Sequence, residues 1–207
     1  MTTSFQRHHL SGQRGMGATI ILFTIALIVL VGAALAYGSR GNSKAFSNES
    51  AKVFSSVLLK QSAEYRDAYN RYIFDGGIAA NMTFDTAATT GLFNNIKQYG
   101  VQQDPPVKAF ATPSLWLYNN SVVVTGIGTA GADSIVYVTG LIKEVCEQVN
   151  SQMYGVITVP VETALADAAA MATAGATILS PTFTGRATGC IKLVDNSYAF
   201  YSTLAEN

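Results

Sequence analysis

The sequence predicts an α+β fold in which a long N-terminal helix, membrane-spanning in its first half, packs on an antiparallel β-sheet. One observation is an unbroken apolar run over residues 18–37, about the 20 residues that a helix needs to cross a bilayer. Another is the amphipathic periodicity that starts at Lys44, which is typical of a helix with one buried face. The remainder is rich in short strand-like segments and turn residues, as expected of a sheet.

These patterns divide the chain into four parts. Residues 1–15 form a short polar leader and 16–37 an apolar helix segment. Residues 38–75 continue as an amphipathic helix, and 76–207 form a β-rich head of a size that supports one core. This order predicts a protein held in a membrane by its N-terminus, with its folded body on the far side.

The leader is basic, which bears on orientation. It contains Arg7 and Arg14 and no acidic residue, a bias that favours a cytoplasmic N-terminus. Arg40 and Lys44 follow the apolar run closely, so the difference in charge across the run is modest. A single pass with the N-terminus in the cytoplasm is the favoured topology.

The amphipathic segment predicts a helix that ends at Asp75-Gly76-Gly77. Its apolar residues recur at spacings near three, four and seven, and the charged residues fall largely between them. The residues of this apolar stripe are Phe46, Val53, Val57, Leu58, Tyr65, Tyr69, Tyr72 and Ile73. We expect the aromatic series Phe54, Tyr65, Tyr69 and Tyr72 to face the core and cover the inner face of the sheet.

In the head, two hairpins and one short helix are predicted. The first hairpin pairs 115–118 with 122–125 around Asn119-Asn120, and the second follows Cys190 and turns at Asp195-Asn196. The helix covers 141–153 and carries Cys146. Further strands are expected at 135–139 and 156–159, a short helix at 92–99, and a helix or an ordered loop at 162–176.

Only two cysteines occur, Cys146 and Cys190. In an exported chain, two thiols are most simply explained as one disulfide. A pair of free structural thiols is the alternative. A zinc site is disfavoured because it needs about four ligands, and the only histidines, His8 and His9, are in the leader.

Composition and motifs argue against several classes of function. The 13 Lys and Arg residues balance 13 Asp and Glu residues, so no excess of positive charge indicates nucleic-acid binding. Histidine is absent from the exported body, so a Ser-His or Cys-His nucleophile has no base there. Gly126, Gly128 and Gly131 match the dinucleotide pattern G-x-G-x-x-G, but the following residues resemble a strand rather than a helix. A glycine-rich hairpin turn is the better interpretation, and we predict neither enzymatic activity nor a cofactor.

Taken together, the chain resembles a type IV pilin or a related pseudopilin. The features that carry the resemblance are the leader ending in Arg14-Gly15, the apolar segment from Met16 with its amphipathic continuation, and a C-terminal region bounded by Cys146 and Cys190. The first cysteine on a short helix, and methionine rather than phenylalanine at position 16, are closer to the type IVb group.

The resemblance implies processing and assembly rather than chemistry. A prepilin peptidase would cut between Gly15 and Met16 and methylate the new N-terminus, and Cys146 and Cys190 would close the C-terminal disulfide region. The subunit would wait in the inner membrane and then assemble with copies of itself or with other pilin subunits. The product would be an extracellular filament or a periplasmic pseudopilus.

One position departs from the family pattern, and two other interpretations stay open. The fifth residue after the cut is usually glutamate in this family and is Ile20 here, which favours a minor or tip-located subunit.

Ala34-Leu35-Ala36 also resembles a signal-peptidase site, with cleavage before Tyr37, as in a secreted protein. A single-pass anchored protein that keeps its leader is the remaining alternative.

Overall fold

The structure is a computed structural model that describes residues 43–179 and 184–206. The predicted leader (1–15), the apolar segment (16–37) and residues 38–42 lie outside the described residues. By its contacts the chain divides into two units, Met1–Phe46 and Ser47–Asn207, and the second contains the sheet. No helix within the described ranges is both long and apolar enough to cross a membrane.

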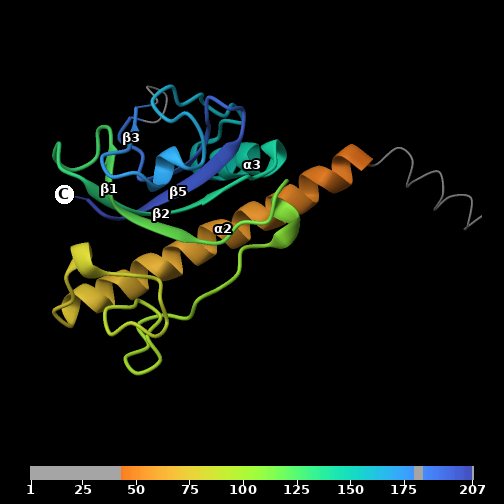
Figure 1. The fold of residues 1–207 in the computed structure, drawn as a ribbon. Coiled ribbons are helices and arrows are strands. Elements are labelled where there is room, and N and C mark those ends of the chain that lie inside the picture. The colour runs from red at the N-terminus through yellow and green to blue at the C-terminus, as the bar shows by residue number, and fades with distance from the viewer. Residues whose placement is uncertain (1–42, 180–183, 207) are drawn as a thin grey trace, which may run out of the picture. The chain divides into compact units, whose positions relative to one another are not determined.

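The fold of the second unit is α+β, as predicted, with a five-stranded sheet in the order β3-β1-β2-β5-β4 (Figure 1). The expectation of a purely antiparallel sheet is wrong, because β3 pairs with β1 in parallel. The helices are α2 (Ser43–Phe74) and α3 (Lys143–Tyr154), with 3-10 turns at Ala79–Asn81, Val107–Ala109 and Ala170–Ala172. The strands are β1 (Leu117–Val124), β2 (Asp133–Thr139), β3 (Thr177–Ile178), β4 (Thr188–Lys192) and β5 (Tyr198–Ala205).

Helix α2 ends where the sequence predicts, before Asp75. Gly76 adopts a φ of +83°, a conformation that glycine reaches without steric cost. Its amide donates to the carbonyl of Ile73, and the amide of Gly77 donates to that of Tyr72. These bonds satisfy carbonyls that the end of a helix otherwise leaves free.

The buried face of α2 differs in part from the predicted stripe. Leu58, Tyr65, Tyr69 and Tyr72 are buried as expected, but Val53 is 59% exposed and Ile73 also faces solvent. The actual face repeats at alternating spacings of four and three, the period of a helix that keeps one side on a partner. Small residues complete that face, and a prediction based on large apolar residues could not find them. In order the repeating positions are Ala51, Ser55, Leu58, Ser62, Tyr65, Tyr69 and Tyr72, and Gln61 and Ala68 are buried beside them.

Each face of the sheet belongs to a separate core. In β2, Val136 and Val138 face α2 and α3, while Ile135 and Tyr137 face the other way. That second face is covered by the segment after α3, which contributes Leu165, Met171, Ala176 and Ile178. Strand β2 is therefore buried on both sides, which explains its continuous apolar run from Ile135 to Val138.

The hairpin predicted around Asn119-Asn120 is wrong, because both residues lie within the single strand β1. The pairing with β2 shifts by one residue between Asn119 and Val122, which is the signature of a β-bulge. The Asn119 side chain accepts from the amide of Ser121 and donates to the carbonyl of Met171. Because of the bulge, Tyr118 belongs to the core under α2 and Val122 to the core on the opposite face.

Other elements of the head follow the sequence more closely. Strand β2, helix α3 and the β4–β5 hairpin are all present, and Asn196 in its turn has a φ of +71°. Residues 156–159 form no strand and 92–99 form turns instead of a helix. Residues 162–176 form an ordered loop that contains the 3-10 turn Ala170–Ala172.

The glycine motif lies in the connection between β1 and β2, which pair antiparallel. This confirms the turn interpretation, since no helix follows the glycines to receive a pyrophosphate. Gly126 has a φ of +83°, and a Cβ atom there would come within 2.7 Å of the Gly185 amide nitrogen. The glycine therefore permits close approach of the segment that precedes β4.

Shortening single side chains on α2 to alanine tests which of its residues face the core. We expect Leu58→Ala to lower the free energy of unfolding by about 2–5 kcal/mol, because Leu58 is fully buried. The exposed neighbour Val53 supplies the control, and Val53→Ala should change it by less than about 0.5 kcal/mol. Denaturant unfolding measures both, and equal losses would contradict the assignment of the faces.

Candidate functional site

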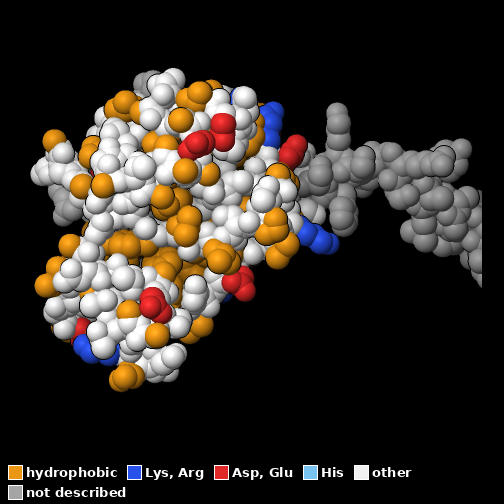
Figure 2. All heavy atoms as spheres, in the orientation of Figure 1, with side chains coloured by type: hydrophobic (Ala, Val, Ile, Leu, Met, Phe, Trp, Pro, Cys, Tyr) orange, Lys and Arg blue, Asp and Glu red, His pale blue; other side chains and the backbone are white. Residues whose placement is uncertain are grey.

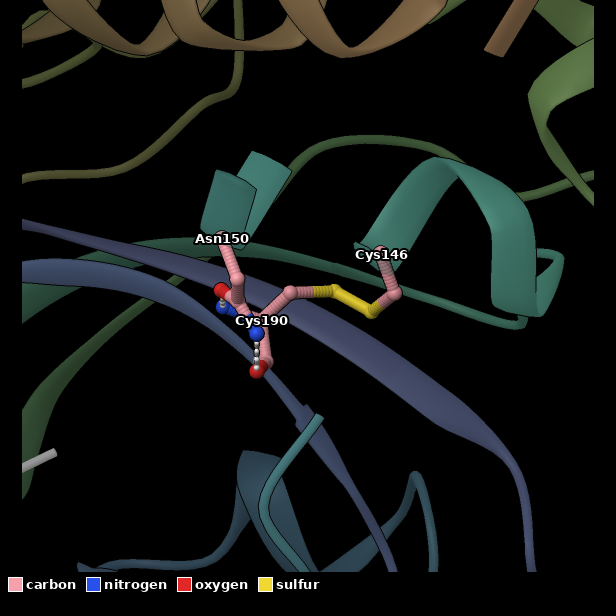
Figure 3. The surroundings of a disulfide bond; sticks show 3 residues. All are labelled: Cys146, Asn150 and Cys190. Carbon is pink, nitrogen blue, oxygen red and sulfur yellow. Dashed lines mark hydrogen bonds between the residues drawn. A yellow bond between two sulfur atoms is a disulfide. The ribbon is translucent and has the colours of Figure 1, made fainter. Parts of the chain in front are cut away.

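The C-terminal region is closed by a disulfide between α3 and β4. Cys146 and Cys190 lie at disulfide distance, with Cα atoms 5.3 Å apart, and both side chains are fully buried. Figure 3 shows the bond connecting the helix to the strand. Val145 and Val149 pack into the same core as both cysteines. The cross-link therefore connects two elements that are already in contact.

Asn150 pairs with the backbone of Cys190 on the same side (Figure 3). Its Nδ2 donates to the Cys190 carbonyl and its Oδ1 accepts from the Cys190 amide, both at 2.9 Å. Asn150 lies one helical turn after Cys146, so both residues project from the same face of α3. The two bonds reproduce the pattern that a neighbouring strand would make with Cys190.

Further contacts occupy the rest of the outer edge of β4. The Tyr154 hydroxyl donates to the carbonyl of Thr188. At the other end, the Lys192 amide donates to the Pro160 carbonyl at 2.9 Å, and the Glu162 amide donates to the Lys192 carbonyl at 2.8 Å. Groups from the cysteine-bounded region thus stand where a sixth strand would otherwise pair.

A buried carboxylate fixes the loop that covers the second face of the sheet. Glu162 is fully buried, and its oxygens accept from the amides of Ala164 at 3.0 Å and Leu179 at 2.7 Å. Such charge-assisted bonds are stronger than those between neutral groups.

Tyr201 is a second buried polar group on this face of the sheet. Its hydroxyl donates to the Arg186 carbonyl, and burial raises the pKa of Tyr201 well above its ordinary value.

On the other face, α2 holds the segment that leads into β1. Gln61 donates through Nε2 to the Asp104 carbonyl and accepts from the indole N–H of Trp116, each at 3.0 Å. The Tyr65 hydroxyl donates to the Gln103 carbonyl and accepts from the Gln103 amide, both at 2.9 Å. Burial of the Tyr65 phenol is the main cause that raises its pKa to about 12.

The exposed side of α2 carries a shallow groove of about 550 Å³, with Val53 and Val57 in it and Lys52 and Lys60 beside it. Gln152 of α3 borders the groove and bonds to α2 at Ser55. Figure 2 shows hydrophobic side chains gathered across the middle of the face drawn, with charged side chains scattered singly. Such a surface is suited to contact with other proteins more than to binding a highly charged ligand.

The predicted site residues fall into two groups. The structure brings Cys146 and Cys190 together, whereas Gly15 and Met16 lie outside the described residues. Within residues 43–179 and 184–206, no three His, Cys, Asp or Glu side chains form a group that holds a metal. That the chain is no enzyme and binds no cofactor stays a prediction.

Comparisons with protein-family models, with curated proteins and with solved structures find no match to this chain.

Sequence reasoning missed Asn150, although a signal for it exists. In the predicted helix, Val145, Cys146 and Val149 mark one apolar face, and Asn150 lies on that face. A polar residue on an otherwise buried helical face needs hydrogen-bond partners. Its position one turn after a cysteine therefore indicates a contact with the segment to which the cysteine is linked.

Removal of the disulfide tests its contribution to stability. We expect the double variant Cys146→Ala, Cys190→Ala to lose about 4 kcal/mol of unfolding free energy, because the bond closes a loop with a sequence separation of 44. Denaturant unfolding of both proteins, with reduced wild type as the control, measures the loss. A loss below about 1 kcal/mol would contradict the loop-closure account.

High pH tests the bonds of Tyr65. Its folded pKa of about 12 lies above the ordinary value of 10.0, so the neutral phenol contributes stability that is present below pH 10 and is lost as the pH rises through 12. We expect Tyr65→Phe to lose less unfolding free energy between these two pH values than the wild type. Denaturant unfolding at both pH values measures the difference, and identical losses would contradict this role.

Proposed function

We propose that this chain is a structural subunit of a type IV pilus or a related pilus-like filament, assembled through its apolar N-terminal segment. The observation that carries the proposal is the order of parts around Gly15. A basic leader meets residues 18–37, which contain no charge, and only residues 38–42 separate that run from Ser43, where α2 begins.

The folded unit supports the proposal in its architecture. Helix α2 carries one buried face along the sheet and leaves its other face to solvent. In the proposed subunit, the apolar segment that enters the membrane or the filament core precedes this helix in the chain. Lipid and neighbouring apolar helices are both apolar environments, so copies of the chain replace lipid at little cost, whereas exposing that surface to water would cost about 25 cal/mol per Å².

Ile20 is consistent with a subunit in a special position. A carboxylate at that depth in lipid is costly, and an isoleucine avoids this cost while removing a charge that would pair with a neighbour's terminal amine. We propose a minor or tip-located subunit on this ground. Its partners are then other pilin subunits, and its processing enzyme is a prepilin peptidase.

A secreted protein is the second candidate, and one observation favours it. Ala34-Leu35-Ala36 ends an apolar core in the way that a signal-peptidase site does. Cleavage there would remove the apolar segment and release the head. The position of the mature N-terminus therefore separates the two candidates.

The deciding experiment is N-terminal sequencing and intact mass of the protein recovered from the cell envelope. An N-terminus at Met16 that carries one added methyl group supports the pilin-like function. A start at Tyr37 overturns it in favour of a secreted protein, and an uncut Met1 overturns it in favour of a permanent anchor.

A variant at the junction sharpens this test. We expect Gly15→Val to abolish the cut before Met16 and leave the chain at full length, because the branched side chain replaces the glycine that precedes the cut. Gly17→Ala, two residues away, is the matched control and should be processed like the wild type. Normal processing of Gly15→Val would contradict cleavage by a prepilin peptidase.

A further inference from the structure

Three adjoining hollows lie where the end of α2 meets the loop that follows it, which Figure 1 shows in yellow beside the helix. One, which we call the Phe74 hollow, has a volume of about 450 Å³ and lies between residues 70–75 and 97–99. The other two, of about 210 and 460 Å³, share Tyr99 with it. Tyr99 is buried, packs edge-on against Tyr72 and donates its hydroxyl to Asp75 at 3.1 Å. Its ring is therefore a fixed wall common to all three hollows.

The charges around the Phe74 hollow favour an anionic ligand. Arg71 and Lys97 line it, and neither forms an ion pair within the described ranges. The Lys97 ammonium lies 5.8 Å from the centre of the Tyr99 ring. Asp75 is the one acid among the described residues of the lining, and one of its oxygens already accepts from Tyr99. Two positive charges against one negative charge complement a ligand with a single carboxylate in this hollow.

The remaining polar groups of the hollow require a ligand that both donates and accepts hydrogen bonds. Gln98 has a φ of +47°, a conformation that is uncommon outside glycine. Its Nε2 donates to the Asn95 carbonyl at 3.1 Å, which leaves its Oε1 as an acceptor. Asn70 supplies a donor and an acceptor, and the second oxygen of Asp75 is another acceptor. A carboxylate cannot donate to these oxygens, whereas a hydroxyl group donates and accepts.

Phe74 adds an accessible aromatic ring at the same place. Its side chain is 92% exposed and lines the hollow. The face of an aromatic ring carries negative potential, which attracts the C–H bonds on the apolar face of a sugar ring. Sugar rings combine such a face with a rim of hydroxyl groups. The aromatic ring and the polar groups beside it therefore match the two kinds of surface that a sugar presents.

We propose that the Phe74 hollow binds a saccharide that carries a carboxylate. Arg71 and Lys97 bind the carboxylate, and Phe74 stacks on the sugar ring. Asp75 and Gln98 accept from its hydroxyl groups. A volume of about 450 Å³ is in the range of sites for small ligands, and the adjoining hollows extend the surface for neighbouring sugar units.

Ligand-observed NMR titration with the full chain in detergent tests the class of ligand. The probes are trigalacturonate and a hyaluronan tetrasaccharide, two acidic saccharides with different sugars and linkages. We expect at least one to bind, and its neutral methyl ester to bind about tenfold more weakly, because charge-assisted hydrogen bonds are lost. Failure of both to bind at millimolar concentration overturns the proposal. Equal binding of tri-aspartate also overturns it, since the hollow would then be a site for acidic peptides.

Arg71→Gln tests whether the carboxylate is bound in this hollow. We expect about tenfold weaker binding of the acidic saccharide and unchanged binding of the methyl ester. Arg66→Gln is the matched control, because Arg66 is exposed on the same helix and lines none of the three hollows. Equal weakening by the two variants would indicate general attraction to positive charge and overturns the proposal.

Phe74→Ala tests the stacking. We expect about fivefold weaker binding of both the acidic saccharide and its methyl ester. Because Phe74 is exposed, the fold should be unaffected. Ile96→Ala is the control, since Ile96 is 87% exposed in the same loop and lines none of the three hollows. Full binding by Phe74→Ala, or equal loss in Ile96→Ala, overturns the proposal.

This binding does not depend on filament assembly. The cut at Met16 and the affinity of the Phe74 hollow are measured separately, so either proposal can fail while the other stands. A secreted head would carry the same hollow.

Discussion

The structure depends on covering both faces of one five-stranded sheet. Strand β2 is buried on its two sides, so the sheet needs a layer above and a layer below. Helices α2 and α3 form one layer, as they do in many α+β folds. The other layer is a loop with a single 3-10 turn, Ala170–Ala172, and it therefore lacks the regular backbone bonds with which a helix satisfies itself. The contacts that Glu162 and Asn119 make with this loop follow from this difference.

A covering loop requires fixed partners for its backbone, and the chain supplies them from a few side chains. Glu162 holds the amides of Ala164 and Leu179, and Asn119 holds carbonyls at Met171 and Thr173. Each of these side chains is buried and therefore costly unless it is bonded. The same bonds that satisfy them also specify the course of the loop. The disulfide adds a constraint on the unfolded chain, and these side chains determine the shape of the folded one.

The sequence predicts the regular elements of this fold better than the irregular ones. The end of α2, helix α3, strand β2 and the β4–β5 hairpin follow from periodicity and turn residues, because local preference and tertiary packing agree there. Asn119-Asn120 suggests a turn by local preference, but the pair forms a bulge because Asn119 bonds to residues that are distant in the sequence. Val53 has the same apolar character as Leu58, and only the contacts of the folded chain show which of the two faces the core.

Of the candidate site, the cysteine pair is predictable from the sequence. A contact of Asn150 near Cys190 is indicated by its place on the apolar face of α3, one turn after Cys146. The partners of Glu162 are not predictable, since they are set by long-range packing.

The buried face of α2 also bears on how the head of the proposed filament subunit stays attached to its helix. Its contact residues run from Ala51 to Tyr72, about 32 Å along the helix at 1.5 Å per residue. Ala51 and Ser55 are buried near α3, whose Gln152 bonds to Ser55, and Tyr65 contacts Phe93 and Trp116 in an aromatic cluster. A pull on the N-terminal segment would therefore be shared among many contacts along the helix. Detaching the head from α2 requires breaking the packing, the aromatic contacts and the Gln61 and Tyr65 bonds together, which is consistent with the proposed anchoring through one end of this helix.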